Sequence, residues 1–254
     1  MNDLQIVIPM AGRGSRFAQA GYTTPKPLIP VGGRPMIQWV IDNIRPNRPH
    51  HFIFLCLAEH LRDYPEVPAE LQRLCPGCTI VPVAAVTEGA ACTVLLARHW
   101  IDSAAPLMIA NSDQLVDLDI NDYLAAQDAP GVGGLIMTFW SDHPKWSYCR
   151  LRPDGSVTEV VEKKVVSNEA TVGIYNFREG RDFVRAADAM IAANLRVNNE
   201  FYVAPTYNQL IAEGATIVTR RTGRELQGMY GVGTPEDLNL FLQTAFFARH
   251  RLPA

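Results

Sequence analysis

The amino-acid sequence predicts an α/β fold, with a mostly parallel mixed sheet flanked by helices. Short β-branched and aliphatic runs alternate with helical patterns along the 254 residues, as expected for such a sheet. The length fits one domain over 1–254, in which about 140–232 forms a smaller lobe. Neither an internal repeat nor a long linker in the sequence indicates a second domain.

The first half of the chain predicts four strands and three helical stretches. The apolar run around Ile6 predicts a strand over 4–9, and Pro35, favoured at a first helical position, begins a helix over 35–44. Further apolar runs predict strands over 51–57, 79–83 and 107–110. A mixed, partly helical stretch at 57–74 and a helix over about 89–101 separate them.

The second half predicts a hairpin, three more strands and three helices. The turn Pro153-Asp-Gly155 joins 150–152 to 157–162. The other strands are expected over 133–139, 172–177 and 216–219, and the helices over 180–194, 199–213 and 235–250. Asn199 is expected to be the N-cap of the second helix. In the last helix Leu238, Phe241, Leu242, Ala245 and Phe246 share one face, which should pack on the core or form a dimer contact.

Composition excludes several classes of protein. The net charge of −3 disfavours nucleic acid as the main partner. No window approaches the ~18 apolar residues of a membrane span, and the first apolar run is too short for a signal peptide. Five scattered cysteines favour reduced thiols, and Cys75-Pro-Gly-Cys78 is interpreted as a turn. We therefore expect a soluble, cytoplasmic protein.

A loop rich in glycine and arginine, Ala11-Gly12-Arg13-Gly14-Ser15-Arg16, follows the first strand. Glycines let several backbone N–H groups approach one oxyanion, and Arg13, Arg16 and the nearby Lys26 can add positive charge. Phe17 stands where a dinucleotide-binding motif needs its third glycine, and the Gly-Lys-Ser/Thr of nucleoside triphosphatases is absent. The loop predicts a polyphosphate site, the alternative being a plain turn with surface arginines.

Asp113 follows the buried run that ends at Ala110. Ligands of open parallel sheets lie beyond the carboxyl ends of the strands, so this carboxylate should share a crevice with the glycine loop. An oxygen ligand there suits Mg²⁺. The alternative is an aspartate that begins a turn or caps a helix.

The pairing of Gly12-x-Gly-Ser-Arg-Phe17 with Thr24-Pro-Lys-Pro-Leu28 resembles the signature of the sugar-phosphate nucleotidylyltransferases. The spelling Gly89-Ala-Ala-Cys-Thr93 resembles their capsule and surface-polysaccharide branch. The resemblance implies a Rossmann-like fold of the GT-A type. It also implies Mg²⁺-dependent transfer of a nucleotidyl group from an NTP to a sugar 1-phosphate or similar phosphorylated small molecule, with release of pyrophosphate.

The resemblance also implies roles for particular residues. Arg16, Lys26 and Asp113 would be catalytic, with Asp113 on the metal. The nucleotide would be bound by Ala11, Gly12, Arg13, Gly14, Thr87, Gly89 and Ala90. The acceptor would be bound from the smaller lobe by Glu162, Lys163, Asn168, Gly173 and Glu200, with Tyr202 a weaker candidate.

Two positions depart from the family pattern. Gly231 stands where family members carry the second metal-binding acid, and Lys164 replaces a proline after Glu162-Lys163. Glu236 and Asp237 are interpreted as helix-capping acids that follow Thr234-Pro235. Either the metal rests on Asp113, waters and substrate phosphates, or another acid replaces the missing one.

Other functions stay open at this point. Gly231 is compatible with a catalytically weak nucleotide- or nucleotide-sugar-binding regulator. A cytidylyltransferase acting on a non-sugar phosphate is another reading, and Asp117-Leu-Asp119 has the spelling of a glycosyltransferase metal motif. The sequence fixes neither the base nor the acceptor, and a homo-oligomer is compatible with it.

Overall fold

A computed structural model describes residues 3–251, and within them eleven strands form one mixed sheet. Nine of these strands lie in the order β5 (Thr79–Val83), β4 (His50–Leu57), β1 (Leu4–Met10), β6 (Leu107–Ala110), β11 (Glu169–Phe177), β8 (Val132–Trp140), β12 (Thr216–Glu225), β13 (Gly228–Gly231) and β7 (Gln114–Val116). The run β5-β4-β1-β6 is parallel, whereas β11 is antiparallel to both of its neighbours. A hairpin of β9 (Ser147–Leu151) and β10 (Val157–Glu162) pairs with β11 through β9.

Helices cover both faces of the sheet because side chains alternate along the central strands. In β1, Ile6 and Ile8 enter one buried cluster and Val7 enters the other. The first cluster includes residues of α2 (Met36–Ile44), α4 (Glu66–Leu74), α7 (Ile120–Gln127), α10 (Pro235–Phe241) and α11 (Ala245–His250). The second includes residues of α5 (Ala90–Leu95), α6 (Arg98–Ile101), α8 (Gly180–Ala192) and α9 (Tyr207–Ala212). The α/β fold predicted from the sequence is therefore confirmed.

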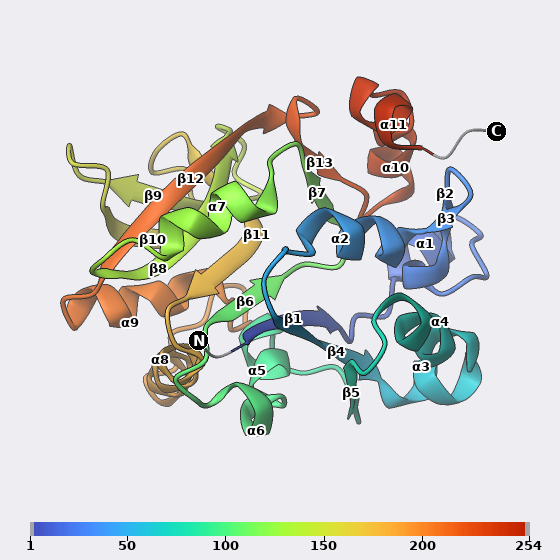
Figure 1. The fold of residues 1–254 in the computed structure, drawn as a ribbon, viewed down its shortest axis with the longest axis horizontal. Coiled ribbons are helices and arrows are strands. Elements are labelled where there is room, and N and C mark those ends of the chain that lie inside the picture. The colour runs from blue at the N-terminus through green and yellow to red at the C-terminus, as the bar shows by residue number, and fades with distance from the viewer. Residues whose placement is uncertain (1–2, 252–254) are drawn as a thin grey trace.

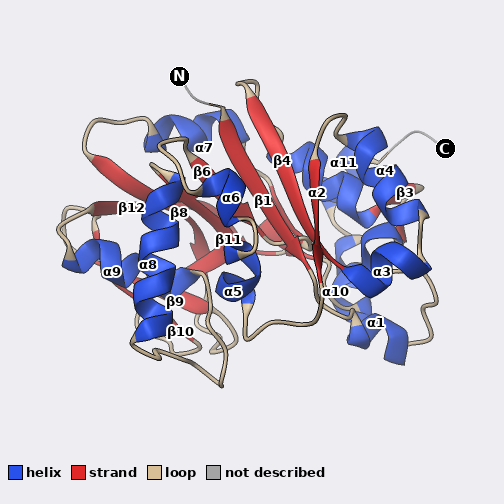
Figure 2. Cartoon of the chain, turned by 90° about the horizontal axis from the view of Figure 1, so that it is seen from below, coloured by secondary structure: helices blue, strands red, loops and turns tan. Residues whose placement is uncertain are grey.

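The two ends of the molecule carry different elements (Figures 1 and 2). The β9–β10 hairpin and α9 lie at one end, and α1 (Ser15–Gln19), α3 (Ala58–Asp63) and α4 lie at the other. The parallel strands β1, β4 and β6 run between them. No helix within residues 3–251 is long and apolar enough to cross a membrane.

Several predicted boundaries are wrong. The helix expected over 199–213 begins with a 3₁₀ turn at Ala204–Thr206 and continues as α9. Asn199 is not its N-cap, because Asn198 and Asn199 have φ of +49° and +63° and belong to a tight turn. The helix expected over 89–101 divides into α5 and α6, and the strand expected over 216–219 extends to Glu225. The short elements α1, β7 and β13 were not predicted.

The last helix is also divided, into α10 and α11, and Thr244 is the N-cap of the second. Because the chain turns there, Leu242 and Ala245 are exposed, contrary to the prediction, while Leu238, Phe241 and Phe246 are buried.

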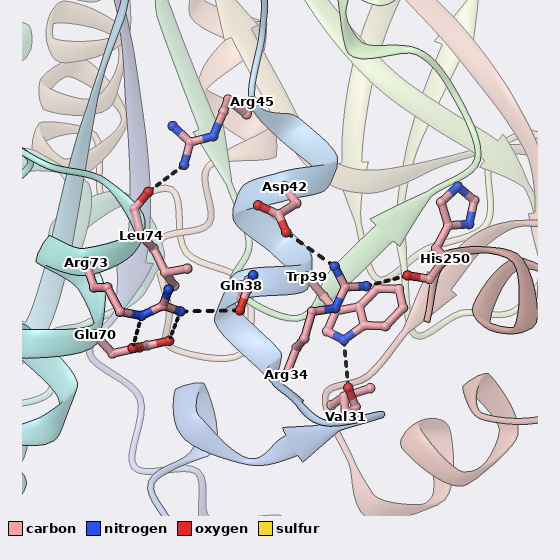
Figure 3. A network of polar contacts seen from close by, with 10 residues as sticks. All are labelled: Val31, Arg34, Gln38, Trp39, Asp42, Arg45, Glu70, Arg73, Leu74 and His250. Carbon is pink, nitrogen blue, oxygen red and sulfur yellow. Dashed lines mark hydrogen bonds and ion pairs between the residues drawn. The ribbon is translucent and has the colours of Figure 1, made fainter. Parts of the chain in front are cut away.

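A polar network ties α11 to the N-terminal part of the chain (Figure 3). The Arg34 guanidinium lies 3.8 Å from the centre of the Trp39 ring and donates to the His250 carbonyl at 2.7 Å. Trp39 in turn donates to the carbonyl of Val31 at 2.8 Å. The small hairpin of β2 (Pro30–Val31) and β3 (Arg34–Pro35) is thus joined to both α2 and α11.

Candidate active site

The glycine-arginine loop connects β1 to α1 at the edge of a cavity of about 580 Å³. Gly14 has φ of +63°, and its carbonyl accepts from the Phe17 amide at 3.0 Å, which begins α1. A side chain at Gly14 would also crowd the Cβ of Lys26 at 3.3 Å. The loop lines the cavity with Gly12, Arg13, Gly14, Ser15 and Arg16, whereas Ala11 is buried behind it.

Lys26 and Asp113 meet in this cavity. The Lys26 Nζ lies 2.5 Å from Oδ2 of Asp113, and each side chain is only about a quarter exposed. The contact follows from the sheet, since β1 and β6 are parallel neighbours whose carboxyl ends lead to the two motifs. The shared crevice predicted for Asp113 and the loop is therefore observed.

Gly233 holds the chain close to Asp113. A Cβ at this position would lie 2.5 Å from the Asp113 Oδ2, and the neighbouring Val232 amide donates to the Asp113 carbonyl at 2.9 Å. Gly233 lines the same cavity. Only a residue without a side chain fits here while the carboxylate keeps its position.

Gly231, the position of the family's second acid, pairs with Gln114 across β13 and β7. A Cβ there would lie 3.9 Å from the Asp237 carboxylate. The capping interpretation of Thr234-Pro235 is confirmed, since the Asp237 amide donates to Thr234 Oγ1 at 3.0 Å. The cavity of about 580 Å³ is called the phosphate-side cavity below, because the loop expected to bind phosphate lines it. Besides Asp113, the carboxylate that lines this cavity is that of Glu200.

The donor set of this cavity fits Mg²⁺. Asp113 and Glu200 offer carboxylate oxygens, and the Lys26 ammonium already occupies a cation position on Asp113. Within residues 3–251 no three His, Cys, Asp or Glu side chains cluster as a metal cage. A magnesium ion would therefore take its remaining oxygens from water and phosphates, as it does in many nucleotide sites.

The segment expected to bind the base lies where α5 begins. Thr87 Oγ1 donates to the Gly89 carbonyl at 2.9 Å, and Ala90 opens the helix. Gly89 has φ of +125°, and a Cβ there would lie 2.4 Å from the Phe201 carbonyl oxygen. The glycine is therefore required by the close approach of the Phe201 backbone.

A second cavity of about 210 Å³ adjoins the first, and Asn111 lines both. Glu162, Lys163 and Gly173 line this second cavity, as does Ala90. Of the other residues expected on the acceptor, Glu200 lies on the phosphate-side cavity, and the exposed Asn168 is not among the residues that line either cavity.

Glu162 is a buried carboxyl, 8% exposed, that accepts a hydrogen bond from the Ser147 hydroxyl. Burial raises its pKa above the ordinary glutamate value. Gly173 has φ of +99°, and a Cβ there would overlap the side chains of Asn111 and Gln114, which are joined at 2.7 Å. The floor of the cavity is thus closely packed around Gly173.

Sequence reasoning missed several residues of the two cavities, among them Ser147, Asn111 and Gly233. Ser147 has no local signal, because its contact with Glu162 depends on the pairing of β9 with β10. Asn111 lies in the motif that was recognised through Asp113 alone. The sequence did offer a signal for Gly233, because it lies two residues after Gly231, where the family pattern is broken.

Comparison with known proteins identifies the family. A model of the family described as nucleotidyl transferase matches residues 6–198. The chain belongs to the nucleotidyl transferase family. This confirms the family and the enzyme class expected from the sequence, whereas the capsule branch stays a prediction.

Individual relatives of this nucleotidyl transferase agree with that family. The bifunctional protein GlmU of Paraburkholderia xenovorans is 29% identical over 245 residues, which cover 92% of this chain and 50% of that protein. The chain spans half or less of the length of the curated relatives it matches. A nucleoside-diphosphate-sugar pyrophosphorylase of Vibrio cholerae is similar in structure, with a TM-score of 0.81 and 26% identity over 94% of this chain and 100% of that one. A Bacillus anthracis protein crystallised with sucrose shares the fold at 18% identity, with a TM-score of 0.73 over 93% and 92% of the two chains.

Proposed function

We propose that the protein transfers a nucleotidyl group from an NTP to a small phosphorylated acceptor and releases pyrophosphate. The observation that carries this proposal is the 2.5 Å contact between Lys26 and Asp113 in a cavity that shares Asn111 with the Glu162–Lys163 cavity. With the triphosphate in the first cavity and the acceptor in the second, the two substrates would lie side by side, as in-line transfer between two polyanions requires.

In the reaction, a phosphate oxygen of the acceptor attacks the α-phosphorus of the NTP. One P–O bond forms, the bond between the α-phosphorus and the bridging oxygen breaks, and that oxygen leaves with pyrophosphate. The acceptor phosphate is already ionised at neutral pH, so no general base is needed. Catalysis then depends on positioning and on neutralising charge on the leaving group.

The residues divide into four groups. Backbone amides of 11–14 with Arg13, Arg16 and Lys26 would hold the triphosphate, and Arg16 and Lys26 would stabilise the departing pyrophosphate. Thr87, Gly89 and Ala90 would bind the base. Glu162, Lys163, Gly173 and Asn168 would bind the acceptor, although Asn168 lines neither cavity. Asp113, with Glu200 on the same cavity, would hold Mg²⁺, which supplies charge neutralisation at the phosphates.

The finer assignments are also part of the proposal. The default acceptor is a sugar 1-phosphate, and the pathway is surface-polysaccharide precursor synthesis, with cytidylyl transfer to a non-sugar phosphate as the alternative. Residues 1–254 would act as one catalytic domain with an acceptor-side lobe at about 140–232. We place the reaction in the cytoplasm because NTPs are available there, without nucleic acid or membrane partners.

A pyrophosphate-release assay tests the proposal. The protein is incubated with each of the four NTPs and a panel of sugar 1-phosphates and amino-alcohol phosphates, with and without Mg²⁺. We expect release that needs one NTP, one acceptor class and the metal. Nucleotide binding without turnover for any acceptor would favour the alternative function, a catalytically weak nucleotide-binding regulator, with which Gly231 is compatible.

A further inference from the structure

One short segment, residues 196–203, lies between the two cavities. A tight turn at Asn198 and Asn199 is closed by paired backbone hydrogen bonds between Val197 and Glu200, at 2.9 and 3.0 Å. Beyond the turn, Glu200 lines the phosphate-side cavity, whereas Tyr202 and Val203 line the second cavity, which is proposed above to hold the acceptor. The segment therefore contributes residues to both cavities.

The backbone of this segment is fixed to the expected base-binding loop. The Phe201 amide donates to the Glu88 carbonyl at 2.8 Å, and the Phe201 carbonyl accepts from the Ala91 amide at 3.0 Å. The Phe201 side chain is only 1% exposed. Tyr202, the next residue, thus extends from a backbone that is held on both sides.

The hydroxyl of Tyr202 contacts the ammonium group of Lys163. The Lys163 Nζ donates a hydrogen bond to this hydroxyl at 2.8 Å. The hydrogen bond therefore restrains the tip of a flexible side chain.

The other end of Lys163 is also constrained. Its φ is +53°, in the left-handed region that residues with a side chain rarely adopt. Such a backbone conformation is strained and persists where the surroundings impose it. Here the Lys163 amide donates to the Trp146 carbonyl at 3.0 Å, directly after β10 ends. The backbone directs the side chain toward the cavity, and Tyr202 holds its tip.

We propose that Tyr202 is a positioning residue for nucleotidyl transfer, which holds the Lys163 ammonium where the acceptor phosphate enters. The role of Lys163 toward the acceptor rests on the proposed function, whereas the restraint of Lys163 by Tyr202 does not. A free lysine side chain loses rotamer entropy when it is ordered. Tyr202 supplies that ordering before the acceptor binds.

The charged and titratable groups around the Lys163 ammonium are few. Glu162, Lys145 and the largely buried Tyr175 line the same cavity, and Glu200 lies on the adjoining one. The hydrogen bond to Tyr202 is the main cause that raises the pKa of Lys163, ahead of the nearby Glu162 and Glu200 carboxylates. Loss of the Tyr202 hydroxyl should therefore lower the pKa of Lys163 and free its tip.

The first test reads Lys163 directly, without substrate or turnover. Wild type and Tyr202→Phe are labelled with a trace of acetic anhydride across a pH series, and mass spectrometry quantifies each of the four lysines. We expect Lys163 in the variant to label faster, with its profile moved to lower pH. Lys145, which lines the same cavity but pairs with Glu225 at 2.8 Å, is the internal control and should not change. An unchanged Lys163 profile would overturn the proposal.

The second test uses the pyrophosphate assay with the acceptor found in the panel. Tyr202→Phe should lower kcat/KM for the acceptor about tenfold while KM for the NTP stays the same, because one positioning contact is lost. In a Lys163→Met background the same substitution should have no further effect. An equal loss in both backgrounds would show that Tyr202 acts independently of Lys163. If wild type releases no pyrophosphate, the proposed function fails, and the labelling result still decides the role of Tyr202.

Discussion

The ammonium of Lys26 lies 2.5 Å from the carboxylate of Asp113, although 87 positions separate the two residues in the chain. From the sequence, Lys26 was expected to bind phosphate and Asp113 was expected to bind a metal, on the basis of two separate motifs. The neighbouring parallel strands β1 and β6 bring both motifs together at their carboxyl ends. A cation and a carboxylate in one crevice would suit the proposed triphosphate site and its metal.

Substitution of either partner should abolish turnover with little effect on folding. We expect Lys26→Ala and Asp113→Asn each to lower kcat/KM by about 10²–10³, as the loss of a charged group at a transition state does. The melting temperature should change little, since ion pairs of partly exposed groups contribute only about 0–1 kcal/mol. Lys164→Ala, at an exposed site that lines neither cavity, is the control. Near-normal rates in both variants would contradict the assignment.

Gly233→Ala should impair metal use specifically. The added Cβ would lie 2.5 Å from Asp113 Oδ2 and would displace the carboxylate. We expect the Mg²⁺ concentration for half-maximal rate to rise about tenfold, the lower end of the effect of disturbed metal-ligand support. Gly231→Ala is a matched control, because its Cβ would stand 3.9 Å from the nearest side-chain atom. Equal metal dependence in the two variants would be evidence against a metal on Asp113.

Gly89→Ala should separate the loop proposed to bind the base from the backbone of Phe201. Its Cβ would meet the backbone of Phe201 at 2.4 Å, and φ is +125°. We expect weaker NTP binding in calorimetry and a lower melting temperature. Gly155→Ala controls for backbone strain alone, because it has φ of +86° and no atom within 4 Å. If both variants bind NTP equally well, the loop is not part of the nucleotide site.

Glu162→Gln should stabilise the protein at neutral pH while impairing acceptor use. Burial raises the pKa of Glu162 in the folded state, so the folded chain binds this proton more tightly than the unfolded chain. Stability therefore falls as pH rises from the ordinary glutamate pKa of about 4.3 through the raised value. Glutamine does not ionise, so the variant should not lose this stability as the pH rises. Thermal unfolding should show a higher melting temperature than wild type at pH 7 and no difference near pH 4. A constant difference at both pH values would rule out the titration of Glu162 as the cause.

Arg34→Ala should loosen the C-terminal helix without affecting catalysis. The variant loses the stacking on Trp39, the hydrogen bond to the His250 carbonyl and the ion pair with Asp42. We expect a destabilisation of about 1–2 kcal/mol in urea unfolding, the sum of one cation–π contact and one charged hydrogen bond. Hydrogen exchange should increase first in α11. Arg73→Ala, which loses an exposed pair with Glu70, should have little effect.

The parts of the site that could be predicted from the sequence depend on strand ends. The glycine loop and Asp113 follow apolar runs that read plainly as strands, and parallel order brings their ends together. The helix expected over 199–213 failed because Asn198, Asn199 and Glu200 have the polarity of a helix start. Two asparagines in the left-handed region instead form a turn.

Contacts made through tertiary packing had no signal in the sequence. The hydrogen bond from Ser147 to Glu162 requires the β9–β10 register, and the contact of Lys163 with Tyr202 joins residues 39 positions apart. The requirement for glycine at position 89 arises from the backbone of Phe201, which is far away in the sequence. Such relationships appear only when the segments are placed in space.

The central claim, nucleotidyl transfer at the Lys26–Asp113 cavity, is tested most directly by following isotope from two positions of the NTP. The protein is incubated with the acceptor and with NTP carrying ³²P at either the α or the γ position. We expect the α label in a phosphatase-resistant product with the acceptor and the γ label in pyrophosphate. Label from the γ position on the acceptor, or α label only in free NMP, would contradict nucleotidyl transfer.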